Sequence, residues 1–222
     1  MNMSLFTHEA LNDGNSAPLG SGCVDALNEQ NAAKITGLQF LRDFISGEQE
    51  RWLFSQIDVR HDADWLADLQ RRVQHYGYRY DYKSRRIAPD MQVGPLPPWL
   101  VSLGGLLVRR GIFTETPDQV IVNEYLPGQG ISRHIDCVPC FEGVIASLSL
   151  GSSCVMEYDN PLQTEKIPLL LKPRSLVVMK GDARYVWRHS IPARQSDTFA
   201  EITTRRERRI SLTFRRVILE NQ

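Results

Sequence analysis

Residues 208–216, RRISLTFRR, alternate between polar and apolar side chains over most of their length. Successive side chains of a β-strand point to opposite faces of a sheet, so this alternation predicts a strand with one polar and one apolar face. The polar face would carry Arg209, Ser211, Thr213 and Arg215. The apolar face would carry Ile210, Leu212 and Phe214. We expect an antiparallel sheet with one buried face, while the polar face is either solvated or part of a site.

Short β patterns separated by Gly, Pro and Asn precede this strand from residue 119 onward. They are QVIVNEY (119–125), GVIASLSLG (143–151), CVMEY (154–158), IPLLLKP (167–173) and SLVVMKG (175–181). No helical pattern separates these runs, which favours a sandwich or barrel over alternating strands and helices. We therefore predict a mainly β (α+β) fold with N-terminal helices packed on an antiparallel double sheet.

The N-terminal part of the chain divides into a tail and a helical region. Residues 1–34 are rich in Asn, Ser, Gly and Ala without periodicity, so we expect a loosely ordered tail. Residues 35–222 would form one domain, with helices in 35–118 and the β core in 119–219. Ser46 followed by Gln49 fits a capping box, which predicts a helix from about Gly47 to Gln56. ADWLADLQRRV, residues 63–73, predicts a second helix.

Composition narrows the functional classes only slightly. The 222 residues include 26 Lys and Arg and 26 Asp and Glu, so net charge alone does not indicate a polyanionic partner. Four cysteines are too few and too unevenly placed for a disulfide scaffold. No apolar run is long enough for a membrane span, and the N-terminus lacks a secretory signal pattern. We expect a cytoplasmic, monomeric protein with no membrane partner.

Residues 123–140, NEYLPGQGISRHIDCVPC, concentrate side chains that bind metals. Cys137 and Cys140 would suit structural zinc only with a second short-spaced pair of ligands, and the other two cysteines are isolated. We therefore expect the two sulfurs to be bystanders. His134 and Asp136 are two residues apart, so on an extended segment they point to one side and can bind one ion together.

A third metal ligand should come from a distant strand, and His189 in YVWRHSIP is the natural candidate. Two His and one carboxylate leave three coordination positions open, which is the arrangement of non-haem Fe(II) oxygenases. Asn123 and Tyr125 form a polar pair just upstream, and the guanidinium of Arg209 suits a carboxylate. Alternatively, His134 and Asp136 belong to a surface turn and His189 is a hydrogen-bonded core residue.

The combined motifs resemble the AlkB family of Fe(II)/2-oxoglutarate dioxygenases, which act on nucleic acids and have a double-stranded β-helix (jelly-roll) fold. The motifs are N-x-Y-x-P-G at 123–128, H-x-D at 134–136, a lone His at 189 and R-x-S-x-T-F-R at 209–215. The similarity extends over about residues 35–219. SLSLGSSCVMEY and RSLVVMKGDARYVWRHSI look particularly like the branch that includes the eukaryotic tRNA wobble-uridine hydroxylases.

The resemblance implies a role for each motif. His134, Asp136 and His189 would bind Fe(II). The 2-oxoglutarate site would comprise Asn123, Tyr125, Arg209, Ser211 and, toward the metal end, Arg215. Ascorbate would serve as reductant. Ser211 stands where many members have Asn, and Val138 stands where several nucleobase demethylases have an acidic residue, so base preference stays open.

Residues 71–86, RRVQHYGYRYDYKSRR, carry six basic residues against one acid, with tyrosines at every second position. On a strand the tyrosines would share one side, and bases stacked on aromatic rings beside cations are typical of single-stranded nucleic-acid binding. The family uses this region as a nucleotide-recognition lid. The predicted contacts are Arg71, Arg72, Tyr76, Tyr78, Tyr80 and Tyr82. An edge strand with solvated arginines is the alternative.

Oxidative demethylation of alkylated bases in DNA or RNA is the leading functional hypothesis from the sequence. The substrate would be single-stranded or flipped out, because a base inside a duplex cannot enter such a pocket. A tRNA-modifying hydroxylase with the same metal centre is the close alternative. A protein hydroxylase and a non-catalytic cupin-like metal protein are further alternatives.

Overall fold

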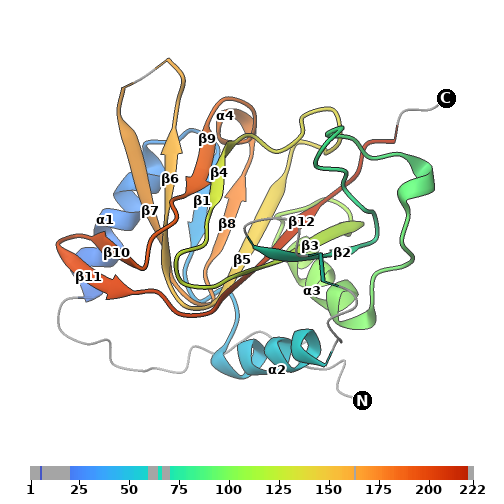
Figure 1. Ribbon diagram of the computed structural model, residues 1–222, viewed down its shortest axis with the longest axis horizontal. Coiled ribbons are helices and arrows are strands. Elements are labelled where there is room, and N and C mark those ends of the chain that lie inside the picture. The colour runs from blue at the N-terminus through green and yellow to red at the C-terminus, as the bar shows by residue number, and fades with distance from the viewer. Residues whose placement is uncertain (1–5, 7–20, 60–64, 67–70, 163, 220–222) are drawn as a thin grey trace.

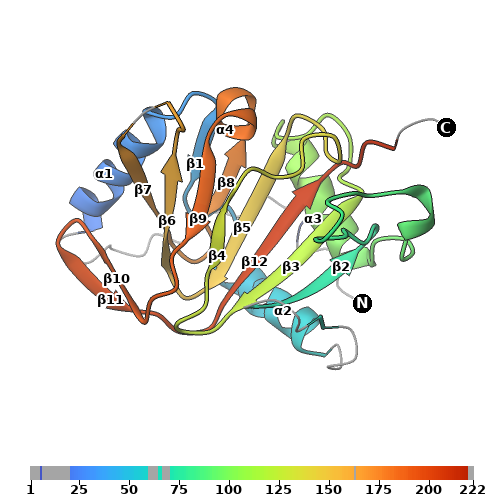
Figure 2. The same ribbon diagram turned by 45° about the horizontal axis from the view of Figure 1, so that its top comes forward.

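Two antiparallel sheets face each other in the computed structural model, which describes residues 6, 21–59, 65, 66, 71–162 and 164–219 (Figures 1 and 2). Within these residues, the larger sheet has six strands in the order β1 (Leu38–Leu41), β8 (Leu176–Met179), β5 (Ile145–Gly151), β12 (Arg209–Arg215), β3 (Gln119–Tyr125) and β2 (Arg72–Tyr76). The smaller sheet of the described chain has the order β4 (Ile131–His134), β9 (Arg188–Ile191), β6 (Cys154–Asp159) and β7 (Lys166–Leu171). Together the sheets form the predicted jelly roll, and β10 (Ser196–Phe199) with β11 (Ile202–Arg205) forms a separate hairpin.

Strand β12 lies inside the larger sheet, paired with β5 on one side and β3 on the other. Its even-numbered side chains, such as Leu212 and Phe214, are fully buried in the core on the outer face of the sheet. Its odd-numbered side chains face the space between the sheets, where Arg209 and Ser211 line a cavity. The predicted alternation is confirmed, and the polar face belongs to a cavity rather than to bulk solvent.

Helices α2 (Gly47–Asp58) and α3 (Pro98–Arg109) cover the outer face of the larger sheet with buried leucines and isoleucine. The helix predicted from the capping box is confirmed and extends two residues further than Gln56. Ser46 Oγ accepts from the Gln49 amide at 3.1 Å, and Gln49 Oε1 accepts from the Ser46 amide at 2.8 Å. The reciprocal bonds satisfy two backbone donors at the start of α2.

The second predicted helix, over residues 63–73, is wrong where the structure describes it. Leu66 forms a β-bridge with Val73, and Arg72–Tyr76 is strand β2, which pairs along β3. The exposed edge of β3 offers backbone partners that a helix could not use, so sheet pairing overrides the local helical pattern. Residues 63, 64 and 67–70 lie outside the described residues.

The tail predicted for residues 1–34 is wrong for helix α1 (Ser21–Ala33), which lies against β7 and β1 (Figure 1). Asn28 binds the backbone of Leu170 in both directions, with its Nδ2 at 2.9 Å from the carbonyl and its Oδ1 at 2.7 Å from the amide. Asn31 Nδ2 donates to Pro168 O at 2.9 Å. The two amides thereby occupy main-chain groups of an edge strand that would otherwise be free to pair with another chain. Residues 1–5 and 7–20 lie outside the described residues.

Both edge strands of the larger sheet, β1 and β2, come from residues before 119, so the expected start of the β core at that residue is wrong. The strands predicted after residue 119 are all present, and β4, β9, β10 and β11 are additional. The short helices α4 (Gly181–Tyr185) and η3 (Pro89–Met91) complete the described secondary structure. None of the described helices has the length and apolar character that a membrane span requires.

Candidate active site

A cavity of about 580 Å³ lies between the two sheets. This volume lies in the range of ordinary small-molecule sites. The cavity brings together every residue that the sequence assigned to the metal and to the cosubstrate: His134, Asp136, His189, Asn123, Tyr125, Arg209, Ser211 and Arg215. The strand period explains the convergence, because these side chains come from inward-facing positions of β3, β4, β9 and β12 and from the loop after β4.

The three candidate metal ligands meet at one end of this cavity. His134 ends β4 directly opposite His189 on β9, and their ring centroids are 4.3 Å apart. Asp136 Oδ2 lies 4.0 Å from His189 Nε2, too far for a hydrogen bond. Two donors bound to one ion at about 2.1 Å each lie about 3.0 to 4.2 Å apart, so one ion can bridge this distance. Among the described residues, no group of three or more His, Cys, Asp or Glu side chains is arranged closely enough to hold a metal ion as it stands.

The hydrogen bonds and charges of the two imidazoles suit metal binding. His134 Nδ1 lies 2.8 Å from Ser132 O, which can only accept, so Nδ1 carries a proton and Nε2 is the nitrogen left to bind a metal. Burial, and then the neighbouring His134, lower the pKa of His189 to about 3 against the opposing effect of Asp136. His189 is therefore neutral at pH 7, and its buried Nδ1 has no hydrogen-bond partner among the described residues.

Asp136 is a buried carboxylate held by Arg215, whose Nη2 donates to Asp136 Oδ1 at 2.9 Å. Burial alone would raise the pKa of Asp136, but Arg215 and the two imidazoles outweigh that effect and hold the pKa well below its usual range. Arg215 thus lies at the metal end, as the resemblance implies. Two imidazoles and one ionised carboxylate are the donor set that Fe(II) oxygenases use, so the residues fit the implied metal.

Arg209 forms the opposite, cosubstrate end of the cavity and is 3% exposed. Its Nη2 donates to Ser149 Oγ at 2.8 Å, while the buried Nε and Nη1 have no partner among the described residues. These buried donors need acceptors, and a carboxylate is the anion that a guanidinium binds well. Arg209 pairs in register with Tyr125, and Ser211 pairs with Asn123. Neutral donors therefore lie beside the Arg209 guanidinium at this end of the cavity. Ser149 is a member of this group that the sequence did not single out.

Comparison with known proteins identifies the family of this chain. The model of the 2OG-Fe(II) oxygenase superfamily matches residues 37–215. The chain is also 35% identical over 163 residues to the alpha-ketoglutarate-dependent dioxygenase alkB homolog 7, mitochondrial, of Mus musculus, covering 70% of this chain and 73% of that protein. This chain is an AlkB-family 2OG-Fe(II) oxygenase. Its dioxygenase class follows from that membership.

Further relatives of this AlkB-family chain differ in length. It is 38% identical over 193 residues to the uncharacterized protein L905 of Acanthamoeba polyphaga mimivirus, covering 86% of this chain and 90% of that protein. It is 36% identical over 199 residues to the tRNA (carboxymethyluridine(34)-5-O)-methyltransferase alkbh8 of Xenopus tropicalis, covering 82% of this chain but 32% of that protein. The structure of OsALKBH1 matches with a TM-score of 0.59 at 17% identity, over 81% of this chain and 96% of that one, which supports the fold.

The lid segment of this AlkB-family chain leaves the sheet at Gly77, where φ is +77°. A Cβ at Gly77 would lie 1.8 Å from Asp118 O, so only glycine permits the turn. The alternating tyrosines therefore do not share one side as predicted. Tyr76 packs edge-to-face on Trp99 in the helix-covered core, so its assignment to nucleic-acid binding is wrong. Tyr78 is half-buried against the core and does not line the cavity.

Tyr80 and Tyr82 do line the cavity, and His75 holds both. The Tyr80 amide donates to His75 Nδ1 at 3.2 Å, which places the imidazole proton on Nε2, 3.3 Å from the Tyr82 hydroxyl. Burial, and then Arg215, Arg79 and Arg71, lower the pKa of His75 to about 4. His75 is therefore neutral at pH 7, as this pair of contacts requires. The sequence analysis did not identify this lid anchor.

Arg71 and Arg72 point to opposite faces of the larger sheet. Arg72 pairs with Glu124 on the outer face and stacks over the Trp65 ring at 4.3 Å, so it does not line the cavity, and its role in nucleic-acid binding stays a prediction. Arg71 is 8% exposed and lines the cavity, where its Nε donates to Asn123 Oδ1 at 2.8 Å. Arg71 therefore belongs to the cavity wall rather than to an exposed basic surface.

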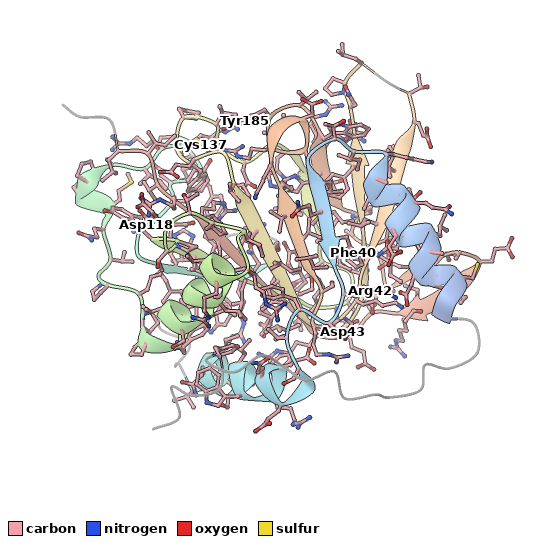
Figure 3. The ribbon with its side chains drawn as sticks, turned by 180° about the vertical axis from the view of Figure 1, so that it is seen from behind. Phe40, Arg42, Asp43, Asp118, Cys137 and Tyr185 are labelled. Carbon is pink, nitrogen blue, oxygen red and sulfur yellow. A yellow bond between two sulfur atoms is a disulfide. The ribbon has the colours of Figure 1, made fainter. Side chains whose placement is uncertain are left out.

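Arg184 on α4 positions the loop that carries Asp136 and was missed by the sequence analysis. It is 2% exposed and donates to four carbonyls of this loop: Asp136 O at 2.9 Å, Cys137 O at 3.1 Å, Phe141 O at 3.2 Å and Glu142 O at 3.4 Å. Figure 3 shows Cys137 and Tyr185 at the same end of the molecule, where α4 meets this loop. Cys137 and Cys140 form a disulfide, so neither is a thiolate available to bind a metal.

Proposed function

We propose that this AlkB-family dioxygenase hydroxylates a modified uridine of tRNA. The observation that carries the proposal is the 36% identity over 82% of this chain to a Xenopus tropicalis protein whose name assigns it to carboxymethyluridine of tRNA. Val138, which stands where several demethylases have an acidic residue, is 46% exposed and does not line the cavity. The demethylase hypothesis therefore lacks the acidic group that helps to read a base.

In this proposal, one group of side chains binds the metal and another binds the cosubstrate. His134, Asp136 and His189 would hold Fe(II), while Arg215 keeps Asp136 ionised and oriented. Arg209 would bind the far carboxylate of 2-oxoglutarate, with Asn123, Tyr125 and Ser211 beside it. When bound, the iron and cosubstrate supply oxidation of a C–H bond by dioxygen, with succinate and carbon dioxide as co-products.

The lid supplies the nucleic-acid contacts in this proposal. The rings of Tyr80 and Tyr82 border the cavity and offer faces for a flipped base. The exposed cations Arg79, Lys83 and Arg86 lie on the same segment, where they can contact backbone phosphates. A single-stranded loop or an extruded base suits this arrangement because the cavity lies between the sheets.

Product analysis tests the proposal. The protein is incubated with Fe(II), 2-oxoglutarate and ascorbate, and receives bulk tRNA, methylated single-stranded DNA or methylated RNA in separate reactions. We expect succinate with tRNA, no formaldehyde, and one uridine derivative that gains the mass of one oxygen atom. Formaldehyde with a methylated base as the sole productive substrate would refute the proposal in favour of demethylation. Reactions without 2-oxoglutarate provide the background.

Replacing Arg209 with alanine should weaken 2-oxoglutarate binding by about 10- to 100-fold, because a buried charged hydrogen-bond pair contributes about 1.5–3 kcal/mol. The affinity is measured without dioxygen by the quenching of tryptophan fluorescence on titration with 2-oxoglutarate. Arg208→Ala is the matched control, since the neighbouring Arg208 pairs with Asp58 and Glu124 instead. An unchanged affinity in Arg209→Ala would remove this residue from the cosubstrate site.

A further inference from the structure

A disulfide closes the loop that carries the candidate metal ligand Asp136. Cys137 and Cys140 are bonded to each other, and Cys137 directly follows Asp136 in the chain. Both cysteines are 4% exposed, whereas the other two cysteines of the chain are free. We expected these sulfurs to be bystanders of the metal, and the candidate ligand set does not use them. A covalent cross-link nevertheless constrains the backbone one residue away from a ligand.

The surroundings of the disulfide leave little room for the two sulfurs to separate. Cys137 Sγ lies 3.2 Å and Cys140 Sγ 3.4 Å from Arg85 O, a main-chain carbonyl of the lid. The loop backbone is held as well, because Arg184 donates to Cys137 O at 3.1 Å. The Ile218 amide donates to Cys140 O at 2.9 Å. Unbonded sulfurs stay at van der Waals distance, and a packed interior does not absorb such a separation, so the loop or the lid must shift when the bond breaks.

The cavity provides a route to one of the two sulfurs. Cys137 and Arg85 line the cavity, whereas Cys140 does not. A small thiol that enters the cavity therefore meets Cys137 first, and Cys140 becomes the leaving group of the exchange. Two residues separate the cysteines, which is the spacing of disulfide oxidoreductase motifs that open and close reversibly. The position and the spacing of this pair both suit reversible chemistry.

We propose that Cys137 and Cys140 form a reversible redox site that controls metal binding. Reduction by two molecules of a thiol such as glutathione breaks the S–S bond, places one proton on each sulfur and yields one glutathione disulfide. Hydrogen peroxide reverses the step: the S–S bond forms again, and the peroxide takes both thiol protons and is reduced to two molecules of water. The dithiol loop has more conformational freedom, so it orients Asp136 less well. The disulfide form is therefore the form with the higher metal affinity.

Thermodynamic linkage gives this proposal a test that requires no turnover. If the disulfide raises the affinity for metal by some factor, metal binding favours the disulfide over the dithiol by the same factor. We expect a factor of about ten, because loss of a contact that orients a metal ligand typically costs 10- to 100-fold in affinity. A tenfold change corresponds to a decrease of about 30 mV in the reduction potential of this two-electron couple when metal is bound.

The experiment measures both sides of this linkage. Mn(II) affinity is determined by electron paramagnetic resonance for the oxidised protein and for protein reduced with dithiothreitol and desalted without dioxygen. Alkylation in denaturant with mass spectrometry verifies the redox state, because the dithiol form takes up two more alkyl groups. The disulfide fraction is then measured in glutathione buffers with and without Mn(II). The oxidised form should bind Mn(II) about tenfold more tightly, and Mn(II) should raise the disulfide fraction correspondingly. Equal affinity of the two forms, or tighter binding by the dithiol form, would overturn the proposal.

Two variants assign the redox response to this pair. Cys140→Ser removes the cross-link without changing a residue that lines the cavity, so it should bind Mn(II) as the reduced wild type does, with or without dithiothreitol. The matched control is Cys23→Ser, which removes an exposed free cysteine on α1 and should keep the full redox response. Circular dichroism verifies that both variants are folded. Affinity of Cys140→Ser equal to that of the oxidised wild type, or loss of the response in Cys23→Ser, would refute the assignment. The wild-type comparison decides the matter by itself if Cys140→Ser does not fold.

Discussion

Replacing Asp136 with alanine should abolish turnover and weaken Fe(II) binding by more than about 100-fold. Asp136 is the only carboxylate that lines the cavity in the described part of the chain. Without it, only the two imidazoles remain, and no anionic ligand offsets the charge of the ion. Loss of even an outer-shell partner of a metal ligand typically costs 10- to 100-fold in affinity or activity, so loss of a ligand should cost more. Metal binding is measured with Mn(II) by its free-ion electron paramagnetic resonance signal, and turnover by succinate release.

The matched control for this substitution is Asp159→Ala. Asp159 is 7% exposed, forms ion pairs with Arg133 and Arg188, and does not line the cavity. This variant should lower the temperature of unfolding but keep metal affinity and turnover at folded temperatures. Wild-type succinate release by Asp136→Ala would refute the ligand assignment and the chemistry that depends on it.

The central part of the site could be predicted because its residues follow the strand period. Arg209 and Ser211 alternate with apolar residues on β12, and the other face of that strand is covered by helices, so the polar face had to turn inward. His134 and Asp136 are two residues apart, which places them on one side wherever the chain is extended. The third candidate ligand, His189, lies on β9, which pairs with β4. The register of this pair places His189 directly opposite His134.

The lid could not be predicted in the same way because the alternation continues past the end of the strand. Tyr76 and Tyr78 follow the same sequence pattern, but Gly77 between them turns the chain against the Asp118 carbonyl. That close approach depends on a residue about forty positions away, which local propensity does not contain. Local propensity likewise does not contain the ion pair of Arg72, whose partner Glu124 lies on a different strand.

Buried polar residues that bind backbone groups were also invisible to the sequence analysis. Arg184 and His75 have no periodic pattern, because what fixes each of them is a main-chain group of a distant loop or turn. Helix α1 shows the same limit, since Asn28 and Asn31 bind the edge of β7 where an apolar stripe would normally mark a packed helix. Tertiary hydrogen bonding, which the sequence does not encode locally, decides these positions.

Replacing Arg184 with methionine should destabilise the protein by about 3–5 kcal/mol and also weaken metal binding by about 10-fold or more. Methionine keeps much of the side-chain volume but removes the donors to the loop carbonyls, and each buried group left unsatisfied costs about 1–3 kcal/mol. In a chain of this length, that loss corresponds to a decrease of about 10 °C in the temperature of unfolding. Because one of the carbonyls belongs to Asp136, the loop would no longer fix the direction of that carboxylate.

Arg206→Met separates the positioning role of Arg184 from simple structural support. Arg206 is 5% exposed, pairs with Asp197, and donates to Pro192 O at 2.8 Å, so its loss should also cost several kcal/mol. Arg206 does not line the cavity and binds no part of the loop after β4 that carries Asp136. Mn(II) affinity is therefore compared between the two variants at a temperature where both are folded by circular dichroism. If both variants bind Mn(II) as the wild type does, Arg184 only supports the fold; a selective loss in Arg184→Met means that its four contacts also orient the metal-binding carboxylate.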